Sequence, residues 1–122
     1  MQQPDASNVS DCRVAMIQAL GVVANQLPAA ARQGLLVAFA TDDSTANEHA
    51  RVLLWEAIAG REQTSEPDVL AARMVICVLH PSGIADDPQT CLEYFIHWYR
   101  ALGLPEQGLA SVLACESRYH QA

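Results

Sequence analysis

The sequence predicts an all-α fold, a compact bundle of about five to six helices that forms a single domain over residues 10–120 after a flexible tail of residues 1–9. Apolar residues recur every three or four positions along most of the chain, which is the spacing of one face of a helix. Four prolines open such stretches and two glycines follow them, as expected of helix starts and stops. Of the 122 residues, 51% are hydrophobic, which is enough to build one core and too many for a disordered chain. The punctuating residues are Pro28, Pro67, Pro88, Pro105, Gly60 and Gly103.

Three helices are predicted in the N-terminal half. They cover residues 10–26, residues 28–40 and, after a turn at residues 41–44, the stretch that ends at Ala59. Helical spacing predicts one buried face on each of them. On the second helix the residues predicted to be buried are Ala31, Leu35, Ala38 and Phe39. On the third they are Ala46, Ala50, Leu53, Ala57 and Ile58.

Three more helices are predicted over residues 66–79, 88–102 and 105–119. Ser65 and Asp68 have the spacing of a capping box at the start of the fourth helix. The end of this stretch, from Met74 to Leu79, is apolar on every side and rich in β-branched residues, which is also typical of a buried strand. Because no second strand is available to pair with it, we expect a central buried helix.

The charge of the chain narrows the choice of partners. Fourteen acidic residues and seven arginines give a net charge of −7, and the arginines are spread along the sequence. Such a chain repels phosphate groups, so neither nucleic acid nor an anionic membrane is an expected partner. From residue 62 onward the net charge is −5, against −2 before it, which favours a basic protein partner. The alternative is that the charge serves solubility alone.

The chain carries no motif that names a reaction. It has no lysine, no phosphate-binding glycine loop and no nucleophile motif, and we predict no enzyme activity and no cofactor. Glu93 and His97 lie four residues apart without the further ligands that a metal site needs. With no predicted signal peptide or membrane span we expect a cytoplasmic, bacterial protein with four reduced and mostly buried thiols. These thiols are Cys12, Cys77, Cys91 and Cys115.

An aromatic block from Tyr94 to Tyr99 is the most distinctive local feature. Phe95 and Tyr99 lie on the predicted core stripe of the fifth helix, whereas Tyr94, Trp98 and His97 fall on adjoining arcs. Val52 and Trp55 likewise lie away from the core stripe of the third helix. Tyr and Trp frequently anchor protein interfaces, although a helix that is central in the bundle would bury the same residues.

These observations lead to one functional prediction and one alternative. We expect a small, acidic, non-enzymatic regulatory or inhibitory protein that binds and sequesters another protein, as immunity proteins and anti-activators do. We also expect a homodimer that forms through the fifth or third helix. The alternative is a small-molecule-binding or enzymatic domain with a pocket lined by Cys77, Tyr94, His97 and Trp98. The residues predicted to bind the partner are Tyr94, His97, Trp98, Trp55, Val52, Glu93 and Glu106.

Overall fold

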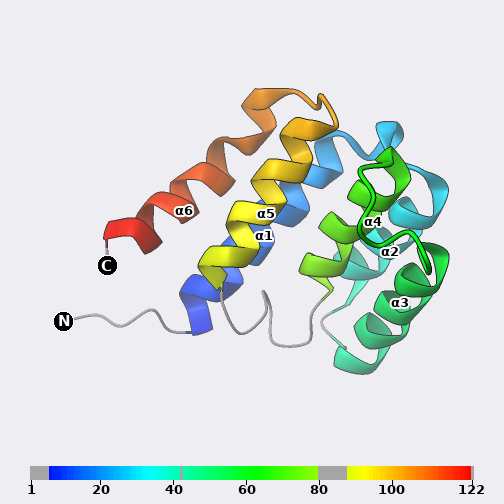
Figure 1. The fold of residues 1–122 in the computed structure, drawn as a ribbon. Coiled ribbons are helices and arrows are strands. Elements are labelled where there is room, and N and C mark those ends of the chain that lie inside the picture. The colour runs from blue at the N-terminus through cyan, green and yellow to red at the C-terminus, as the bar shows by residue number, and fades with distance from the viewer. Residues whose placement is uncertain (1–5, 42, 80–87, 122) are drawn as a thin grey trace.

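The computed structural model describes residues 6–41, 43–79 and 88–121, and within these ranges the chain forms helices and no strand. The helices pack around one hydrophobic core, and Figure 1 shows how they are arranged. The all-α prediction is therefore confirmed. The helices are α1 (Ala6–Val22), α2 (Ala29–Ala40), α3 (Ser44–Ala57), α4 (Pro67–Val78), α5 (Pro88–Ala101) and α6 (Ala110–Gln121), with the short 3-10 helices η1 (Ala24–Gln26) and η2 (Glu106–Leu109).

Proline and glycine mark the helix boundaries largely as predicted. Pro67 and Pro88 begin α4 and α5, where the missing N–H of proline costs nothing. Gly60 and Gly103 adopt φ angles of 84° and 72° after α3 and α5, in the left-handed region that favours glycine. The predicted helix stops therefore lie where backbone geometry requires them.

The first helix differs from its predicted bounds at both ends. It begins at Ala6 rather than Ser10, while residues 1–5 of the predicted tail lie outside the described residues. It ends at Val22, and the chain then tightens into η1 instead of continuing as an α-helix to Gln26. Leu27 is extended, with φ −91° and ψ 149°, because a residue that precedes proline avoids the α conformation.

The predicted capping box at the start of α4 is wrong. Glu66 is the N-cap residue, and no side chain caps the helix. The Glu66 carboxylate instead accepts hydrogen bonds from Arg61 at 3.2 Å and Thr64 at 3.1 Å, and Asp68 pairs with the same Arg61 at 2.9 Å. Arg61 therefore fixes the loop between α3 and α4 in place of a capping hydrogen bond.

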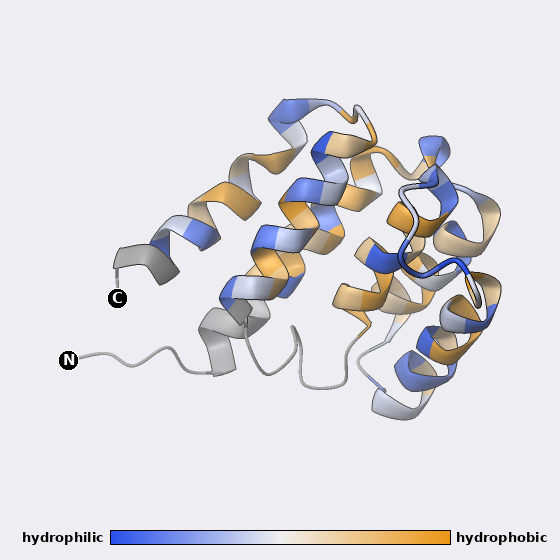
Figure 2. Cartoon of the chain, in the orientation of Figure 1, coloured by the Kyte–Doolittle hydropathy of each residue, from blue (hydrophilic) through white to orange (hydrophobic). Residues whose placement is uncertain are grey.

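The fourth helix is the centre of the fold, and the strand alternative for residues 69–79 is excluded. It packs against α2, α3 and α5, and most of its side chains are buried. Figure 2 shows α4 coloured mostly as hydrophobic, in contrast to the hydrophilic loop that precedes it. The carbonyl oxygen of Val78, at the C-terminal end of α4, accepts a hydrogen bond from Nε of Arg13 of α1 at 2.7 Å.

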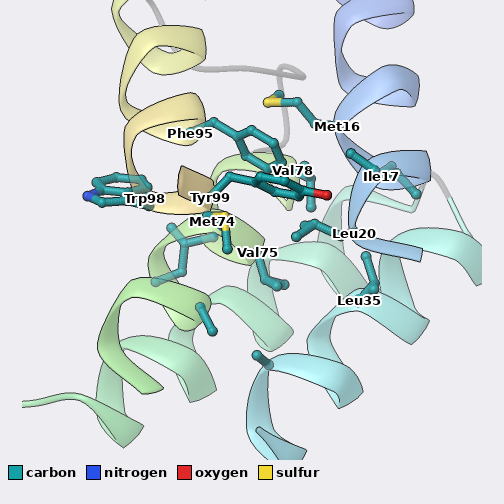
Figure 3. Close-up of a cluster of buried hydrophobic side chains, with 14 of the residues drawn as sticks. Met16, Ile17, Leu20, Leu35, Met74, Val75, Val78, Phe95, Trp98 and Tyr99 are labelled. Atoms are coloured by element: carbon teal, nitrogen blue, oxygen red, sulfur yellow. The ribbon is translucent and has the colours of Figure 1, made fainter. Parts of the chain in front are cut away.

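Most of the largest buried side chains come from α1, α2, α4 and α5. Figure 3 shows Phe95 and Tyr99 of α5 beside Met16 and Leu20 of α1, with α2 and α4 beneath them. The hydroxyl of Tyr99 donates a hydrogen bond to the carbonyl oxygen of Pro105 at 2.8 Å. This bond ties the start of η2, and with it α6, to the core.

Two predicted buried faces need correction. Phe39 is 55% exposed and Leu53 is 52% exposed, although both were expected in the core. Ala57 is exposed as well, and Asn47 occupies the core side of α3 beside Ala50. Helix α2 packs against α1, α3 and α4, and α3 packs against α2 and α4, yet the sides that carry Phe39 and Leu53 stay exposed. Each helix therefore buries a narrower stripe than its apolar residues would allow.

Candidate functional site

The fifth helix, which carries most of the predicted site, is an ordinary amphipathic helix. Phe95 and Tyr99 are fully buried, whereas Glu93, His97 and Arg100 are exposed on the opposite side. Figure 2 shows the two sides as alternating hydrophobic and hydrophilic bands along α5. Its wide apolar arc is covered because α4 packs on one side of it and α6 on the other.

Trp98 lies at the edge of the core. It is 8% exposed, its ring stacks on that of Tyr94 at a centroid distance of 5.5 Å, and the Arg73 guanidinium lies 4.8 Å from the ring centroid. Figure 3 shows Trp98 on the opposite side of α5 from α1. Tyr94 is 54% exposed and covers the indole from the solvent side. Of the two aromatic residues predicted to bind a partner on α5, the structure exposes only Tyr94.

The remaining predicted site residues are on separate parts of the surface. Val52 and Trp55 are exposed on α3, and α4 lies between α3 and α5. Glu106 is exposed and pairs with Arg100, whose Nε lies 2.9 Å from the carboxylate and holds the pKa of Glu106 below its usual value. The structure does not bring the α3 and α5 residues together.

The residues of the predicted alternative pocket are divided between two environments. Cys77 is half-buried at the packing of α4 against α5, where the neighbouring Cys91 and burial raise the pKa of its thiol. Tyr94 and His97 lie on the exposed side of α5. Trp98 lies between these two environments, beneath Tyr94.

The most exposed apolar surface is instead formed around α2, which the sequence interpretation did not single out. Val22, Leu36 and Phe39 are 73%, 64% and 55% exposed, respectively. Leu53 of α3 adds a fourth large exposed apolar side chain on the other side of α2. We refer to these four residues and the two hollows beside α2 as the α2 surface.

The first hollow of the α2 surface lies between α1 and α2. Its volume is about 460 Å³, and its walls include Val22, Leu36 and Phe39 together with Arg32. A Cβ atom at Gly21 would lie only 2.9 Å from Cζ of the Phe39 ring, so a larger residue at this position would displace the ring. The glycine thus leaves room for the Phe39 ring beside α1, while more than half of the Phe39 side chain stays exposed.

The second hollow lies between α2 and α3 and measures about 400 Å³. Val37, Ala46 and Leu53 give it an apolar lining, and Gln33 and His49 are its polar residues. Gly34 also borders it and allows α2 to approach its neighbours, since a Cβ atom there would lie 2.8 Å from a methyl group of Leu54. Helix α2 is therefore a ridge with an apolar hollow on each side.

The composition of α2 was the signal that could have revealed this surface. Apart from Arg32, Gln33 and Gly34, every residue between Ala29 and Ala40 is apolar. Such a helix is usually buried on all sides, but this one lies at the end of the bundle. Its position depends on the tertiary packing, which the periodicity of a single helix does not encode.

The interpretation of the site rests on its geometry alone. Comparison with protein families, characterised proteins and solved structures found no match. Among the described residues, no three His, Cys, Asp or Glu side chains gather in a way that could hold a metal ion. None of the helices over these residues has the length and hydrophobicity needed to cross a bilayer.

Proposed function

We propose that this protein is a small, acidic, non-enzymatic regulator that binds and sequesters another protein through the α2 surface. The observation that carries the proposal is the exposure of Val22, Leu36 and Phe39 around the hollow between α1 and α2, with Leu53 exposed at the hollow between α2 and α3. Large apolar side chains that gather on the surface of a small protein usually mark an interaction site.

The shape of the α2 surface favours an amphipathic helix as the docking element of the partner. A helix that lies along a groove inserts apolar side chains spaced three or four residues apart. The two hollows, of about 460 and 400 Å³, offer room for such side chains on either side of the Leu36 ridge. Exposed Leu36 and Phe39 would in turn pack between the side chains of the incoming helix.

The charges of this protein indicate which residues of the partner helix lie beside its apolar stripe. Arg32 lines the first hollow, is exposed and forms no ion pair among the described residues. A carboxylate beside the apolar stripe of the partner would pair with it. At longer range the net charge of −7 accelerates encounter with a protein whose surface is otherwise basic.

Photo-crosslinking in the native host tests the assignment of the surface. A photoreactive phenylalanine analogue at position 36 should crosslink to one defined protein through an amphipathic helix of that protein. The same analogue at position 111, an exposed residue of α6, serves as the control and should not form this crosslink. Equal labelling from both positions would contradict a specific site on α2.

Two matched variants then compare the α2 surface with the α5 surface predicted from the sequence. Phe39 and Tyr94 are 55% and 54% exposed, so Phe39→Ser and Tyr94→Ser remove similar exposed aromatic area from α2 and α5. Phe39→Ser should weaken binding of the crosslinked partner by about 30-fold or more, the loss typical of an interface hot spot. Tyr94→Ser should leave the affinity nearly unchanged. If Tyr94→Ser weakens binding and Phe39→Ser does not, the interface lies on α5.

A second copy of this chain is the competing occupant of the α2 surface. The homodimer predicted from the sequence forms through the fifth or third helix, whereas a homodimer through α2 would cover Leu36 and Phe39 with their own symmetry mates. Light scattering at tens of micromolar distinguishes the two cases. If the wild type is a dimer and Leu36→Asp is a monomer, the α2 surface binds a second copy of this chain instead of another protein. If the wild type is a monomer at this concentration, the result supports a different protein as the partner.

The hollow between α2 and α3 supports one further candidate, the binding of a small apolar ligand. Its volume of about 400 Å³ falls within the usual range for ligand sites, and Gln33 and His49 could orient a polar group. An apolar fluorescent probe should then bind at one site per chain and be excluded by Ala46→Trp, which fills the hollow. Unchanged probe binding in this variant would remove the candidate.

A further inference from the structure

The hollow between α1 and α2 combines an apolar lining with a single positive charge. It measures about 460 Å³, and Arg32 and Gln18 are the polar side chains among the described residues that line it. No acidic side chain is part of this lining. Sites for small organic ligands have this composition, because apolar walls hold the ligand and a few polar groups orient it. The other lining residues are Gly21, Val22, Ala24, Leu35, Leu36 and Phe39.

The guanidinium of Arg32 differs from those of the other arginines. Among the described residues it forms no ion pair, hydrogen bond or ring contact, although the chain has fourteen acidic residues. Each of the other six arginines contacts a group of this protein. These contacts are Arg13 with the Val78 carbonyl oxygen, Arg51 with Glu48, Arg61 with Glu66 and Asp68, Arg73 with Trp98, Arg100 with Glu106, and Arg118 with Cys115. The positive charge of Arg32 is therefore available to a ligand.

The charge lies at one end of an apolar strip. Phe39 follows Arg32 by seven positions, and Leu36 lies between them, so all three side chains are on the same side of α2. Seven residues of α-helix correspond to about 10 Å. All three line the hollow, and Leu36 and Phe39 are more than half exposed. A ligand that matches this strip has an anionic head and an aliphatic tail of medium length.

We propose that the hollow between α1 and α2 is a binding site for a medium-chain aliphatic carboxylate. The carboxylate pairs with the guanidinium of Arg32, and the alkyl chain lies along Leu36 toward the Phe39 ring. An arginine can hold a carboxylate through two parallel hydrogen bonds, which fixes the direction in which the chain enters the hollow.

Both parts of such a ligand are needed for binding. The net charge of −7 repels anions at long range, so a short carboxylate gains little from Arg32 alone. Each methylene group that is buried in the hollow should raise the affinity by up to about fourfold. The site should therefore prefer an extended aliphatic acid over a small carboxylate.

The ligand would occupy part of the α2 surface. Leu36 and Phe39 would contact either the alkyl chain or a partner helix, but not both at once. The inference thus adds a means of regulation that rests on the proposed function, in which the carboxylate excludes the partner. Binding of the carboxylate itself does not depend on the existence of a partner.

Titration of the protein alone with octanoate tests the site. Amide chemical shifts should change most at residues that line the hollow, such as Val22 and Leu36. Butanoate has the same carboxylate on a shorter chain and should bind at least about tenfold more weakly. Equal affinities for octanoate and butanoate, or shift changes centred on Ala46 and Leu53 of the other hollow, would overturn the proposal.

Two pairs of variants separate the roles of the charge and of the hollow. Arg32→Gln should weaken octanoate binding by about fivefold, whereas Arg32→Lys should retain most of the affinity. Octanol, which carries no charge, should bind both variants as it binds the wild type. Gln18→Trp, which fills the hollow from α1, should abolish octanoate binding, and Ala46→Trp in the other hollow should not. If octanoate binds Arg32→Gln or Gln18→Trp as tightly as the wild type, the assignment is wrong.

The exclusion of the partner is measured separately, through the crosslink from position 36. Saturating octanoate should lower the yield of this crosslink severalfold, while butanoate at the same concentration should not. An undiminished crosslink would overturn the exclusion. If no crosslink forms without octanoate, the proposed function and the exclusion both fail, and the titration alone decides whether the ligand site exists.

Discussion

Replacing Trp98 by alanine should destabilise the fold and leave partner binding by the folded molecules unchanged. A buried tryptophan removes about 200 Å² from water, which at about 25 cal/mol per Å² corresponds to roughly 5 kcal/mol as an upper bound. Trp98 is 8% exposed, and Tyr94 and Arg73 on either side of it can move into part of the space. We therefore expect a loss of about 3 to 4 kcal/mol in the free energy of unfolding, toward the lower end for such substitutions.

The assay is urea denaturation followed by far-UV circular dichroism, which does not depend on the tryptophan that is removed. Trp55→Ala is the matched control, since Trp55 is 39% exposed and its removal should cost about 1 kcal/mol or less. A loss below about 1 kcal/mol for Trp98→Ala would refute the placement of this side chain in the core. A lower affinity of folded Trp98→Ala for the partner would show that Trp98 belongs to the partner interface.

Three further outcomes are expected. Gly108→Ala should lower the free energy of unfolding by about 1 to 3 kcal/mol, because the new Cβ would overlap the Tyr99 hydroxyl. In a double-mutant cycle, adding Tyr99→Phe should recover most of this loss. If the losses of the two single variants simply add, the overlap is contradicted. Asp43→Ala should cost about 1 kcal/mol in thermal unfolding, since the Asp43 carboxylate caps α3 by accepting a hydrogen bond from the backbone N–H of Thr45 at 2.9 Å. Because the pKa of Cys12 is raised to about 12, the unfolded chain loses this proton before the folded chain does. The free energy of unfolding should therefore fall as the pH rises from about 9 to about 12. In Cys12→Ala this fall in the free energy of unfolding should be shallower.

The helical architecture was predictable because its signals are local. Proline at a helix start and glycine after a helix end act through the φ angle and N–H group of single residues, so Pro67, Pro88, Gly60 and Gly103 mark the same boundaries in any helical fold. The fourth helix was predictable by elimination, since a lone strand has no hydrogen-bonding partner.

The exposed surface was not predictable by the same means. An apolar stripe shows which side of a helix faces the core only when the opposite side is polar, as on α5. On α2 almost all residues are apolar, so the sequence does not distinguish Leu35, which is buried, from Leu36 and Phe39, which are exposed. The tertiary position of α2 decides this difference.

The pairing of thiols was equally inaccessible to sequence reasoning. Cys12 and Cys115 come from nearly opposite ends of the chain, and four cysteines allow three different pairings. The packing of α1 on α6 brings Cys115 close enough to raise the pKa of Cys12, and the packing of α4 on α5 does the same for Cys91 and Cys77. The prediction that the thiols are mostly buried is confirmed, since Cys12, Cys91 and Cys115 are buried and Cys77 is half-buried.

The antiparallel packing of α1 on α6 also has a consequence for the order of folding. These two helices are the first and last of the chain, so their contacts join residues about as distant in sequence as the chain permits. The loop-closure entropy of such contacts is the largest in the molecule, and they should form late, after α2 to α5 have assembled. A circular permutant that joins the end of α6 to the start of α1 and opens the exposed loop at residues 63–65 would make these contacts local. The refolding rate of that permutant should increase, and the slowest step of assembly should move to the new chain ends.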